Sequence, residues 1–474
     1  MTSNIKFGTD GWRAVIAEDF TFDNVRACAQ GVADYLLDGG VAKDDLLIGY
    51  DTRFDSEDFA AAVAEVIAAN GIKAYLNPRA APTPVISYAI VVKKAAGGVI
   101  ITASHNPHIY NGFKYKPEYG GSASPEVTAE LEKRIHAIAG SGKIKRLPLS
   151  DGLKQGLIEY YDPEPIYLSH IAKMVDLEHI RKAGLKIAID SMYGAGAGYF
   201  RRLLKGGSTR LIELNYKRNP LFPGIQPEPI ASHLSKLSRR VQTSKADVGL
   251  ATDGDADRIG VLDENGVFVT QLQVFALLTL YLLEIRGERG AIVKSVTTTD
   301  MVYKLGKLYS VPVFETPVGF KYLGPKMMAE NALIGGEESG GFGYRGHIPE
   351  RDGVLSGLYI LDFMVKTGKK PSELIKYLYS KVGPHHYNRI DFHFSEEKRE
   401  AVVQRLSQLK PTEIDNTEVT KIDTVDGFRF RLSDGSWLLI RLSGTEPVVR
   451  IYAESDSPEH VERLLKAGEK LAGI

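Results

Sequence analysis

The feature that most constrains the fold is a repeated pattern, in which a short apolar run ends in a polar loop and a helix-like segment follows. Clear apolar runs are Leu46–Tyr50, Lys186–Asp190 and Ala246–Ala251. Strands that alternate with helices form βαβ units around a mostly parallel sheet, and ligand-binding groups lie at the carboxyl ends of its strands. The pattern therefore predicts an α/β fold with its functional residues in the loops after the strands.

Several domains are expected, because 474 residues exceed what one hydrophobic core normally fills. Polar, turn-rich segments between Gly140 and Pro165, and at Gly383-Pro384, interrupt the pattern. Beyond the second interruption the apolar residues alternate, and the chain ends in an amphipathic helix over 458–471, which is typical of an α+β module. The domains that we expect are residues 1–155, 156–267, 268–382 and 383–474.

Charge and cysteine content exclude several function classes. Lys and Arg total 59 and Asp and Glu total 59, so no basic surface for nucleic acid or an anionic membrane is expected. The longest apolar stretch, Val274–Leu283, is about ten residues, half of what a membrane helix needs. The single cysteine, Cys28, and a start without signal-peptide character favour the reducing cytoplasm. We expect a monomer or a homodimer.

A serine loop follows one of the predicted strands. The apolar run Gly98–Ile101 leads into Ser104-His105-Asn106-Pro107, and Asn111-Gly112 precedes Lys114. Asn and Pro stop the strand and Asn-Gly tolerates positive φ, so Ser104 is presented on an exposed loop where it could act as a nucleophile. An ordinary strand-end turn, in which Ser104 bonds its own backbone, fits the same residues.

Three carboxylates at alternate positions, Asp253, Asp255 and Asp257, follow the run Ala246–Ala251 on a tight loop. Such crowding is self-repulsive unless a cation neutralises it, and an oxygen-only cluster of this size suits Mg²⁺. The strand-like run Ile259–Leu262 after the loop argues against an EF-hand, which needs helices on both sides. A solvated acidic hairpin is the alternative without a metal.

Two further loops have residues suited to a sugar phosphate. Glu337 and Ser339 lie in a glycine-rich loop, where a carboxylate could bind vicinal hydroxyls, and Arg351 follows as a group for an anion. Near the C-terminus, the segment 441–450 combines arginines, hydroxyls and a glycine turn, which together form a phosphate cradle. A serine nucleophile, a metal site and a phosphate cradle are what phosphoryl transfer requires.

The chain resembles the α-D-phosphohexomutases in four ordered segments, which are Thr102–Pro107 (TASHNP), Asp253–Arg258 (DGDADR), Gly336–Gly340 (GEESG) and Arg441–Pro447 (RLSGTEP). The segments span nearly the full length. The resemblance implies three similar α/β domains with mixed sheets and a C-terminal α+β domain, arranged around a central cleft. It also implies that Ser104 is the phosphorylated serine and that Mg²⁺ is held by Asp253, Asp255, Asp257 and the phosphoserine.

The resemblance also implies roles for other residues. The groups expected near the phosphoserine are Arg13, His105, Lys114 and Arg258, with Lys114 as the candidate for proton transfer. Glu337 and Ser339 would hold the 3- and 4-hydroxyls of a hexose. Further substrate contacts are expected from Lys294, Thr316, Gly319 and Arg351. The residues expected to grip the phosphate that is not transferred are Arg441, Ser443, Gly444, Thr445 and Arg450.

By the same resemblance, phospho-Ser104 phosphorylates a hexose monophosphate to a 1,6-bisphosphate and then takes back the other phosphate, so that 1-phosphate and 6-phosphate interconvert. Glu338 in the GEES segment, and Gly341 where other types have histidine, favour glucose, with glucose 1,6-bisphosphate as activator. The mannose type remains an alternative, and so does the glucosamine type, which the N-terminal GTDG and the RLSGTEP segment also resemble. Alternatives of another class are a metal-dependent sugar phosphatase and a non-catalytic sugar-phosphate binder.

Overall fold

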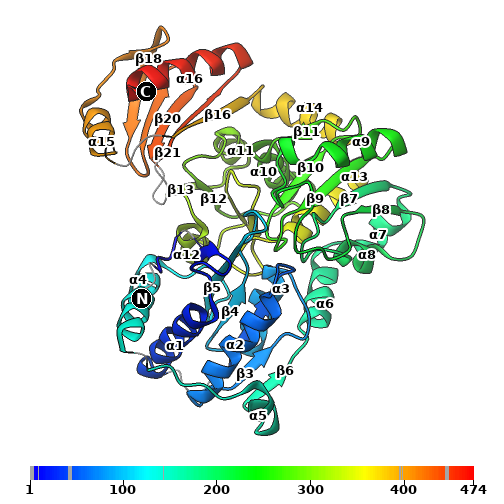
Figure 1. Ribbon diagram of the computed structural model, residues 1–474. Helices are drawn as coiled ribbons and strands as arrows, with labels where there is room; N and C mark the ends of the chain where they lie inside the picture. Colours follow the sequence, from blue (N-terminus) through cyan, green and yellow to red (C-terminus); the bar gives the residue numbers. More distant parts are fainter. Residues whose placement is uncertain are drawn as a thin grey trace.

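The computed structural model describes residues 5–8, 10–40, 45–141, 143–393, 397, 399–442 and 448–473. In this part of the chain the strands form four sheets, each covered by helices (Figure 1). The N-terminal unit, in blue, lies at the bottom of Figure 1, and the C-terminal unit, in orange and red, lies at its upper left. The predicted fold class of three α/β units and a C-terminal α+β unit is confirmed.

Domain I (residues 5–160) contains a six-stranded sheet with the order β1-β5-β4-β2-β3-β6. Its elements are β1 (Trp12–Val15), α1 (Phe22–Asp38), β2 (Leu46–Tyr50), α2 (Ser56–Ala69), β3 (Ala74–Leu76), α3 (Thr83–Lys93), β4 (Gly97–Ile101), β5 (Tyr110–Pro117), α4 (Pro125–Ser141), α5 (Leu149–Lys154) and β6 (Ile158–Tyr160). The central strands β2, β3 and β4 are parallel, whereas β5 runs antiparallel to both β4 and β1. The sheet is therefore mixed.

Domain II (residues 164–269) has the sheet order β11-β10-β9-β7-β8. Its elements are α6 (Glu164–Met174), α7 (Leu177–Lys182), β7 (Lys186–Asp190), α8 (Tyr199–Leu204), β8 (Arg210–Leu214), η1 (Ala231–His233), α9 (Ser235–Ser244), β9 (Val248–Thr252), β10 (Ile259–Leu262) and β11 (Phe268–Val269). Strands β7, β8 and β9 are parallel, and β10 returns antiparallel to β9.

Domain III (residues 271–382) has the sheet order β13-β12-β14-β15. Its elements are α10 (Gln271–Leu280), η2 (Tyr281–Ile285), β12 (Ile292–Ser295), α11 (Met301–Tyr309), β13 (Val313–Thr316), α12 (Phe320–Ala329), β14 (Ile334–Gly336), β15 (Phe342–Tyr344), α13 (Gly353–Thr367) and α14 (Pro371–Val382). As in domains I and II, an antiparallel strand, here β15, follows a parallel strand, β14.

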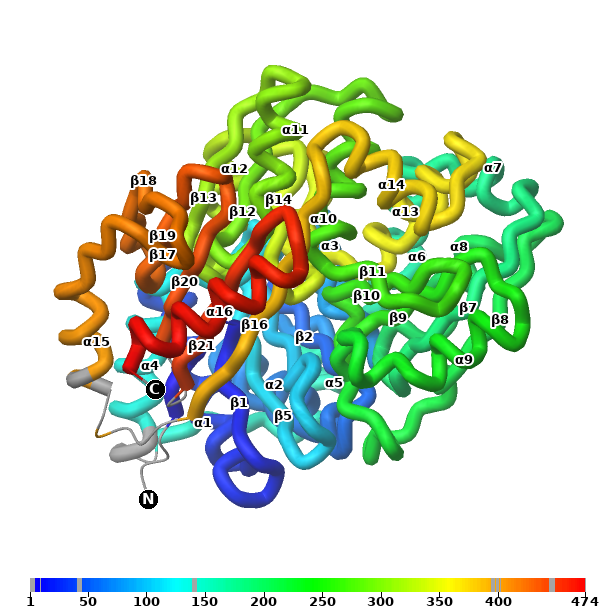
Figure 2. Tube along the Cα trace, turned by 90° about the horizontal axis from the view of Figure 1, so that it is seen from above, coloured from blue at the N-terminus to red at the C-terminus, as the bar shows by residue number. Residues whose placement is uncertain are grey.

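Domain IV (residues 386–473) is a largely antiparallel sheet with the order β16-β21-β20-β19-β18-β17. Its elements are β16 (His386–His393), α15 (Arg399–Gln408), β17 (Glu413–Ile414), β18 (Thr417–Asp423), β19 (Phe428–Leu432), β20 (Trp437–Leu442), β21 (Val448–Ser455) and α16 (Pro458–Ala472). Figure 2, the view from above, shows α16 lying across these strands.

Two predicted domain boundaries need correction. Strand β6 pairs with β3, so domain I extends past the boundary predicted at residue 155. Strand β11 pairs with β10, so domain II extends past residue 267. Both errors have one cause: each strand is only two or three residues long, and its membership depends on pairing that a local pattern does not reveal. The turn-rich segment before Pro165 also contains a helix, α5.

Domains I, II and III are packed into one body, whereas domain IV has a core of its own. One apolar cluster joins α3 of domain I to the sheets of domains II and III, with Ile86, Leu250 and Ile334 among its members. Domain IV is filled by a separate cluster around Phe430 and Ile451. Because apolar burial supplies most of the folding free energy, domain IV is the part least tied to the others.

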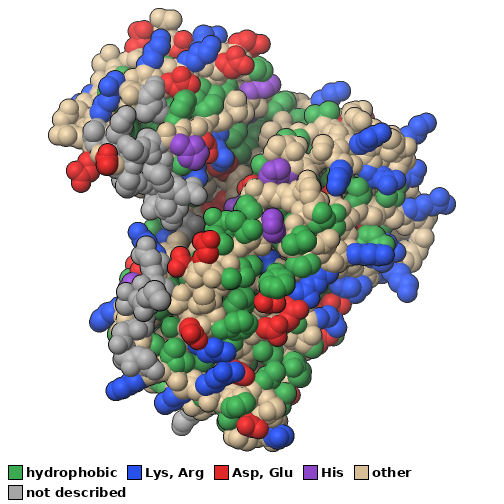
Figure 3. All heavy atoms as spheres, viewed as in Figure 1, with side chains coloured by type: hydrophobic (Ala, Val, Ile, Leu, Met, Phe, Trp, Pro, Cys, Tyr) green, Lys and Arg blue, Asp and Glu red, His purple; other side chains and the backbone are tan. Residues whose placement is uncertain are grey.

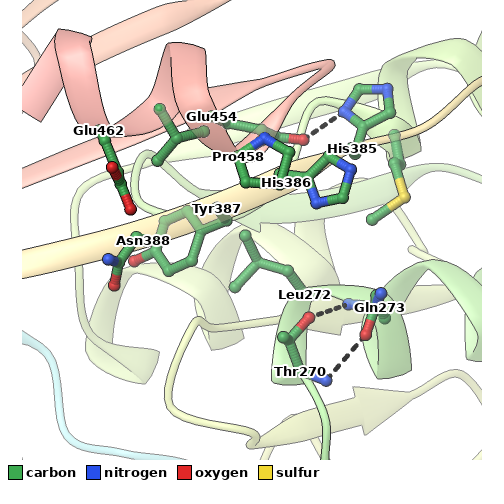
Figure 4. A pocket seen from close by; sticks show the side chains of 12 residues that line it. Thr270, Leu272, Gln273, His385, His386, Tyr387, Asn388, Glu454, Pro458 and Glu462 are labelled. Carbon is green, nitrogen blue, oxygen red and sulfur yellow. Dashed lines mark hydrogen bonds and ion pairs between the residues drawn. The ribbon is translucent and has the colours of Figure 1, made fainter.

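The passage into domain IV is held by polar contacts (Figure 4). His385 pairs through Nδ1 with Glu454, and its Nε2 lies 2.8 Å from Lys304 Nζ. A pocket of about 220 Å³ lies beside them, between α10 and α16, with Gln273 on one wall. Glu454 also accepts from Trp437 Nε1 at 3.0 Å, which ties this passage to the sheet of domain IV.

A histidine pair lies where domains I, II and III meet. His170 of α6 stacks on Tyr88 of α3 with ring centroids 4.3 Å apart, and its Nε2 lies 3.1 Å from His347 Nδ1. His347 Nε2 in turn lies 2.9 Å from Asp352 Oδ2. Burial, and then the neighbouring His347, lower the pKa of His170 from 6.5 to about 4.

This lowered pKa predicts acid sensitivity of the domain junction. The unfolded chain takes up the proton near pH 6.5 while the folded chain resists it until about pH 4, so stability falls as the pH drops through this window. For a half-buried ring we expect a loss of about 1 kcal/mol. His170→Gln should flatten the dependence of unfolding free energy on pH, measured by urea denaturation.

The control is His179→Gln, which changes an exposed histidine of the same domain and should leave the slope as in the original protein. A ring-proton NMR titration gives the second readout. A His170 midpoint near 6.5 would contradict the expectation.

Candidate active site

The four signature segments occupy equivalent places in the fold. In domains I, II and III the loop that joins a parallel strand to its antiparallel neighbour contains Ser104, the Asp triplet and Glu337, respectively. In domain IV the corresponding segment joins the antiparallel strands β20 and β21. Thr83 N–H donates to Asp255 O at 2.9 Å and Ile259 N–H donates to Gly340 O at 3.0 Å, so backbone hydrogen bonds join the first three domains here.

These loops surround a cavity of about 500 Å³. It is lined by Asp10, Arg13, His105, Asn106, Pro107, Tyr110, Gln226, Glu228, Arg258, Val318, Gly319, Phe320, Glu337, Ser339, Arg351 and Arg450. The surface view shows a hollow between the upper-left lobe, which is domain IV, and the rest of the molecule (Figure 3). The central cleft is thus formed by all four domains.

Ser104 lies just after β4, in a left-handed conformation with φ of 53°. Its side chain is buried, so the prediction of an exposed serine is wrong: domain II covers the loop. Its Oγ donates to Asp253 Oδ2 at 2.9 Å and lies 3.4 Å from His105 Nδ1. The backbone N–H of Ser104 donates to Thr102 Oγ1 at 2.8 Å. The hydroxyl therefore faces the acidic triplet of domain II.

Arg53, which the motifs did not single out, holds the serine loop from beneath. Its guanidinium is buried and donates to the carbonyl oxygens of Ser104, Asn106, Pro107 and Tyr110 at 2.6 to 2.9 Å. It also pairs with Asp51 at 3.2 Å. The signal was the charged pair directly after the buried strand Leu46–Tyr50, where loop-binding groups are expected.

The Asp triplet fits a divalent cation. Carboxylate oxygens of Asp253, Asp255 and Asp257 lie within 4.8 Å of one another, and all three side chains are buried. Oδ1 of Asp255 and both carboxylate oxygens of Asp257 accept no hydrogen bond among the described residues. Burial, and then Asp257 and Asp255, raise the pKa of Asp253 well above its ordinary value. Buried, repelling carboxylates with free oxygens are what Mg²⁺ would stabilise.

Two buried cations approach the triplet from the other side. Lys114 Nζ lies 2.9 Å from Asp255 and 2.8 Å from Asp10. Arg351 Nη2 lies 3.0 Å from Asp257 and 2.6 Å from Asp10. Burial disfavours charge on Lys114, but these carboxylates outweigh it and raise the pKa of the ammonium. Asp10 thus joins both cations, although the sequence showed it only as part of a glycine-rich turn.

Arg13, His105 and Arg258 line the cavity near Ser104, as expected. Arg13 Nη1 donates to Asn106 Oδ1 at 2.7 Å, and Arg258 Nη1 lies 3.7 Å from Glu228. Burial, then the positive charges of Arg258 and Arg13, lower the pKa of His105 well below its ordinary value, so its ring is neutral.

The sugar-loop residues also face the cavity. Ser339 Oγ is buried without a hydrogen-bond partner among the described residues, which leaves it free for a ligand hydroxyl. Glu337 is buried and lies 3.7 Å from Arg351, and burial raises its pKa against the opposing charge of Arg351. Gly319, with φ of 124°, lines the wall at the start of α12.

Three residues lie elsewhere than the sequence indicated. Lys294 is fully buried in ion pairs with Asp300 at 2.9 Å and Glu315 at 3.3 Å, and it does not line the cavity. Thr316 is buried and is likewise absent from the cavity lining. Glu338 pairs with Arg389 of β16 at 2.9 Å, so it contacts domain IV and does not line the cavity either.

Part of the phosphate cradle can be located. Arg450 of β21 lines the cavity, and Arg441 of β20 lies opposite it in the antiparallel pair. Directly opposed residues project from the same face of a sheet, so both arginines are on the cavity side. Ser443, Gly444 and Thr445 lie outside the described residues. None of the described helices is long and apolar enough to cross a membrane.

A phosphoryl-transfer site needs a nucleophile, a place for a metal ion and cations that neutralise developing charge, all shielded from water. Domains I, II and III bring these groups to one cavity, which defines the class as a metal-dependent phosphoryl-transfer enzyme. The sequence matches the four phosphoglucomutase/phosphomannomutase domain families over residues 4–141 (domain I), 165–266 (domain II), 271–382 (domain III) and 395–469 (the C-terminal domain).

Whole-length relatives agree. The chain is 31% identical to "Phosphoglucomutase/phosphomannomutase" of Thermococcus kodakarensis, covering 98% of each chain. It is 33% identical to "Probable phosphoglucosamine mutase" of Pyrococcus horikoshii, covering 98% of this chain and 97% of the relative. A crystal structure from Thermus thermophilus, described as a phosphomannomutase, superposes with a TM-score of 0.86, at 34% identity and full coverage of both chains. The chain belongs to the α-D-phosphohexomutase family and is a mutase, an isomerase of sugar phosphates.

Proposed function

We propose that the protein is a phosphoglucomutase, which interconverts glucose 1-phosphate and glucose 6-phosphate through phospho-Ser104 and a glucose 1,6-bisphosphate intermediate. The observation that carries the proposal is the contact between Ser104 Oγ and Asp253 Oδ2 at 2.9 Å, beside a cavity that is lined by Glu337, Ser339 and Arg450.

In the first half-reaction a free hydroxyl of the hexose monophosphate attacks the phosphorus on Ser104. The bond from phosphorus to Oγ breaks, the new bond to the sugar oxygen forms, and the hydroxyl proton goes to a protein group. His105, 3.4 Å from Oγ, and Lys114 are the groups we assign to proton transfer. After the bisphosphate turns over in the cavity, its other phosphoryl group returns to Ser104, so no phosphate is lost.

Mg²⁺, held by the three carboxylates and the phosphoserine, would withdraw negative charge from the phosphoryl oxygens. Arg13 and Arg258, which line the cavity beside Ser104, supply further positive charge. Arg351 pairs with Asp257 and Glu337, so it orients these carboxylates as well as contacting substrate. Arg441 and Arg450, together with residues 443–445, would bind the phosphate that is not transferred.

Ser104 loses its phosphoryl group whenever the bisphosphate escapes from the cavity, so the enzyme needs a way to restore it. Glucose 1,6-bisphosphate added in solution would do so, because it can donate either phosphoryl group to the free serine. We therefore propose it as an activator. The single cysteine, Cys28, is buried and free, which is compatible with the proposed cytoplasmic location.

Sugar preference is the finer part of the proposal. Glucose, mannose and glucosamine phosphates share the 3- and 4-hydroxyls that we assign to Glu337 and Ser339, and they differ at carbon 2. Contacts to the shared hydroxyls cannot separate the three sugars, so discrimination is set by fewer contacts. We expect kcat/KM for glucose 1-phosphate to exceed the other two by about tenfold.

The test compares kcat/KM for the three 1-phosphates with the fully phosphorylated enzyme and added bisphosphate. Higher activity on mannose or glucosamine 1-phosphate would contradict the glucose assignment while leaving the mutase intact. Release of inorganic phosphate at the rate of substrate loss would instead indicate a phosphatase.

A further inference from the structure

Asp426 joins two walls of the cavity. It lies in the turn between β18 and β19 of domain IV, and its Oδ2 accepts the backbone N–H of Val318 of domain III at 2.9 Å. Its other oxygen, Oδ1, lies 2.9 Å from Nε of Arg441. One carboxylate thus contacts both the loop of domain III that lines the cavity and an arginine of the phosphate cradle.

The domain III partner is itself part of the cavity wall. Val318 and Gly319 both line it, in the short loop between β13 and α12. A hydrogen bond to a backbone N–H fixes the loop independently of its side chains. Asp426 therefore holds domain IV in a set position against this loop.

The contact to Arg441 is supported by close packing of the same turn. Gly427, with φ of 96°, lies so near that a Cβ would be 2.7 Å from Ile440 O and 3.0 Å from Arg441 Cα. A side chain at residue 427 would push on the arginine's backbone, so the turn touches Arg441 at its main chain and at its guanidinium.

The ion pair is well shielded. The side chains of Arg441 and Asp426 are 11% and 22% exposed, against 40% and 20% for the Arg389 and Glu338 pair that also spans domains III and IV. Shielded pairs with good geometry are screened less by salt and hold their partners more firmly than exposed ones. Of these two contacts between domains III and IV, that of Asp426 constrains an arginine most directly.

We propose that Asp426 is a positioning residue of the mutase, which fixes the direction of the Arg441 guanidinium by anchoring it to the loop of Val318. The inference rests on the proposed function, in which Arg441 binds the phosphate that is not transferred. Asp426 contacts Arg441 and does not touch substrate. Its loss affects binding of the distant phosphate more than the chemistry at Ser104.

The test uses Asp426→Asn and Asp426→Ala with steady-state kinetics. Asparagine keeps the shape and the acceptor for Val318 N–H but removes the charge, and alanine removes both. We expect KM for the hexose monophosphate to rise by about threefold for Asn and about tenfold for Ala, with kcat changed by less than about twofold. Asp434→Asn, at another turn of domain IV where the carboxylate accepts Ser436 N–H, is the matched control and should leave both constants unchanged.

A double-mutant cycle separates this inference from the proposed function. If Asp426 acts through Arg441, adding Asp426→Ala to Arg441→Ala should raise KM by less than about twofold beyond Arg441→Ala alone. Additive effects, or a kcat loss at unchanged KM, would overturn the positioning role. An Arg441→Ala variant with normal KM would instead overturn the phosphate-binding role on which it rests.

Discussion

Ser104→Ala should abolish interconversion of the two monophosphates, with a loss in kcat of at least about 10⁴-fold. The covalent route requires an oxygen that can hold the phosphoryl group between the two half-reactions, and alanine has none. The fold should persist, because Ser104 is replaced by a smaller side chain with the same backbone restriction at φ of 53°. Binding of glucose 1,6-bisphosphate, measured by calorimetry, should change by only a few-fold.

Ser87→Ala is the matched control. Ser87 is a buried serine of α3 in the same domain, and its Oγ has no hydrogen-bond partner among the described residues. Its loss should leave kcat and KM as they were. Retention of more than a few per cent of turnover by Ser104→Ala would exclude the phosphoserine as the carrier.

Asp253→Asn should change activity and stability in opposite directions. A missing metal ligand costs several kcal/mol of transition-state stabilisation, so we expect kcat/KM to fall by about 10³-fold. In metal-free protein the same change removes one of three repelling buried carboxylates. Because burial and its neighbours raise the pKa of Asp253, its ionised form disfavours the fold at neutral pH, and Asn should raise Tm.

Asp263→Asn controls for a general effect of charge removal in domain II. Asp263 accepts backbone N–H groups in the turn after β10 and lies outside the cavity lining. The variant should retain activity. Chelation of divalent ions should inactivate the unmodified protein reversibly, and a fall in Tm of metal-free Asp253→Asn would contradict the repulsion argument.

The strands nearest the site could be predicted from sequence almost to the residue. Runs such as Leu46–Tyr50, Lys186–Asp190 and Ile259–Leu262 match β2, β7 and β10, because each is almost wholly buried and is bounded by a polar loop. The shared position of the signature loops could not be predicted. It depends on which strand returns antiparallel, and strand direction is not visible in a local apolar run.

The groups that sequence reasoning missed are those whose partners lie far along the chain. Asp10 contacts Arg351, 341 residues away, and Asp426 contacts Val318, 108 residues away. A local pattern shows such residues only as members of polar turns. Lys294 shows the converse, because a lysine at a strand end reads as a ligand until the opposing Asp300 and Glu315 are seen.

The central claim is that one phosphoryl group moves between Ser104 and the sugar. The most direct measurement is intact-mass and peptide mass spectrometry of the protein after incubation with glucose 1,6-bisphosphate, and again after addition of excess glucose 6-phosphate. The account predicts one phosphoryl group on the peptide that contains Ser104 in the first sample, and its loss to the sugar in the second. A protein that turns over substrate without phosphate on that peptide would contradict it.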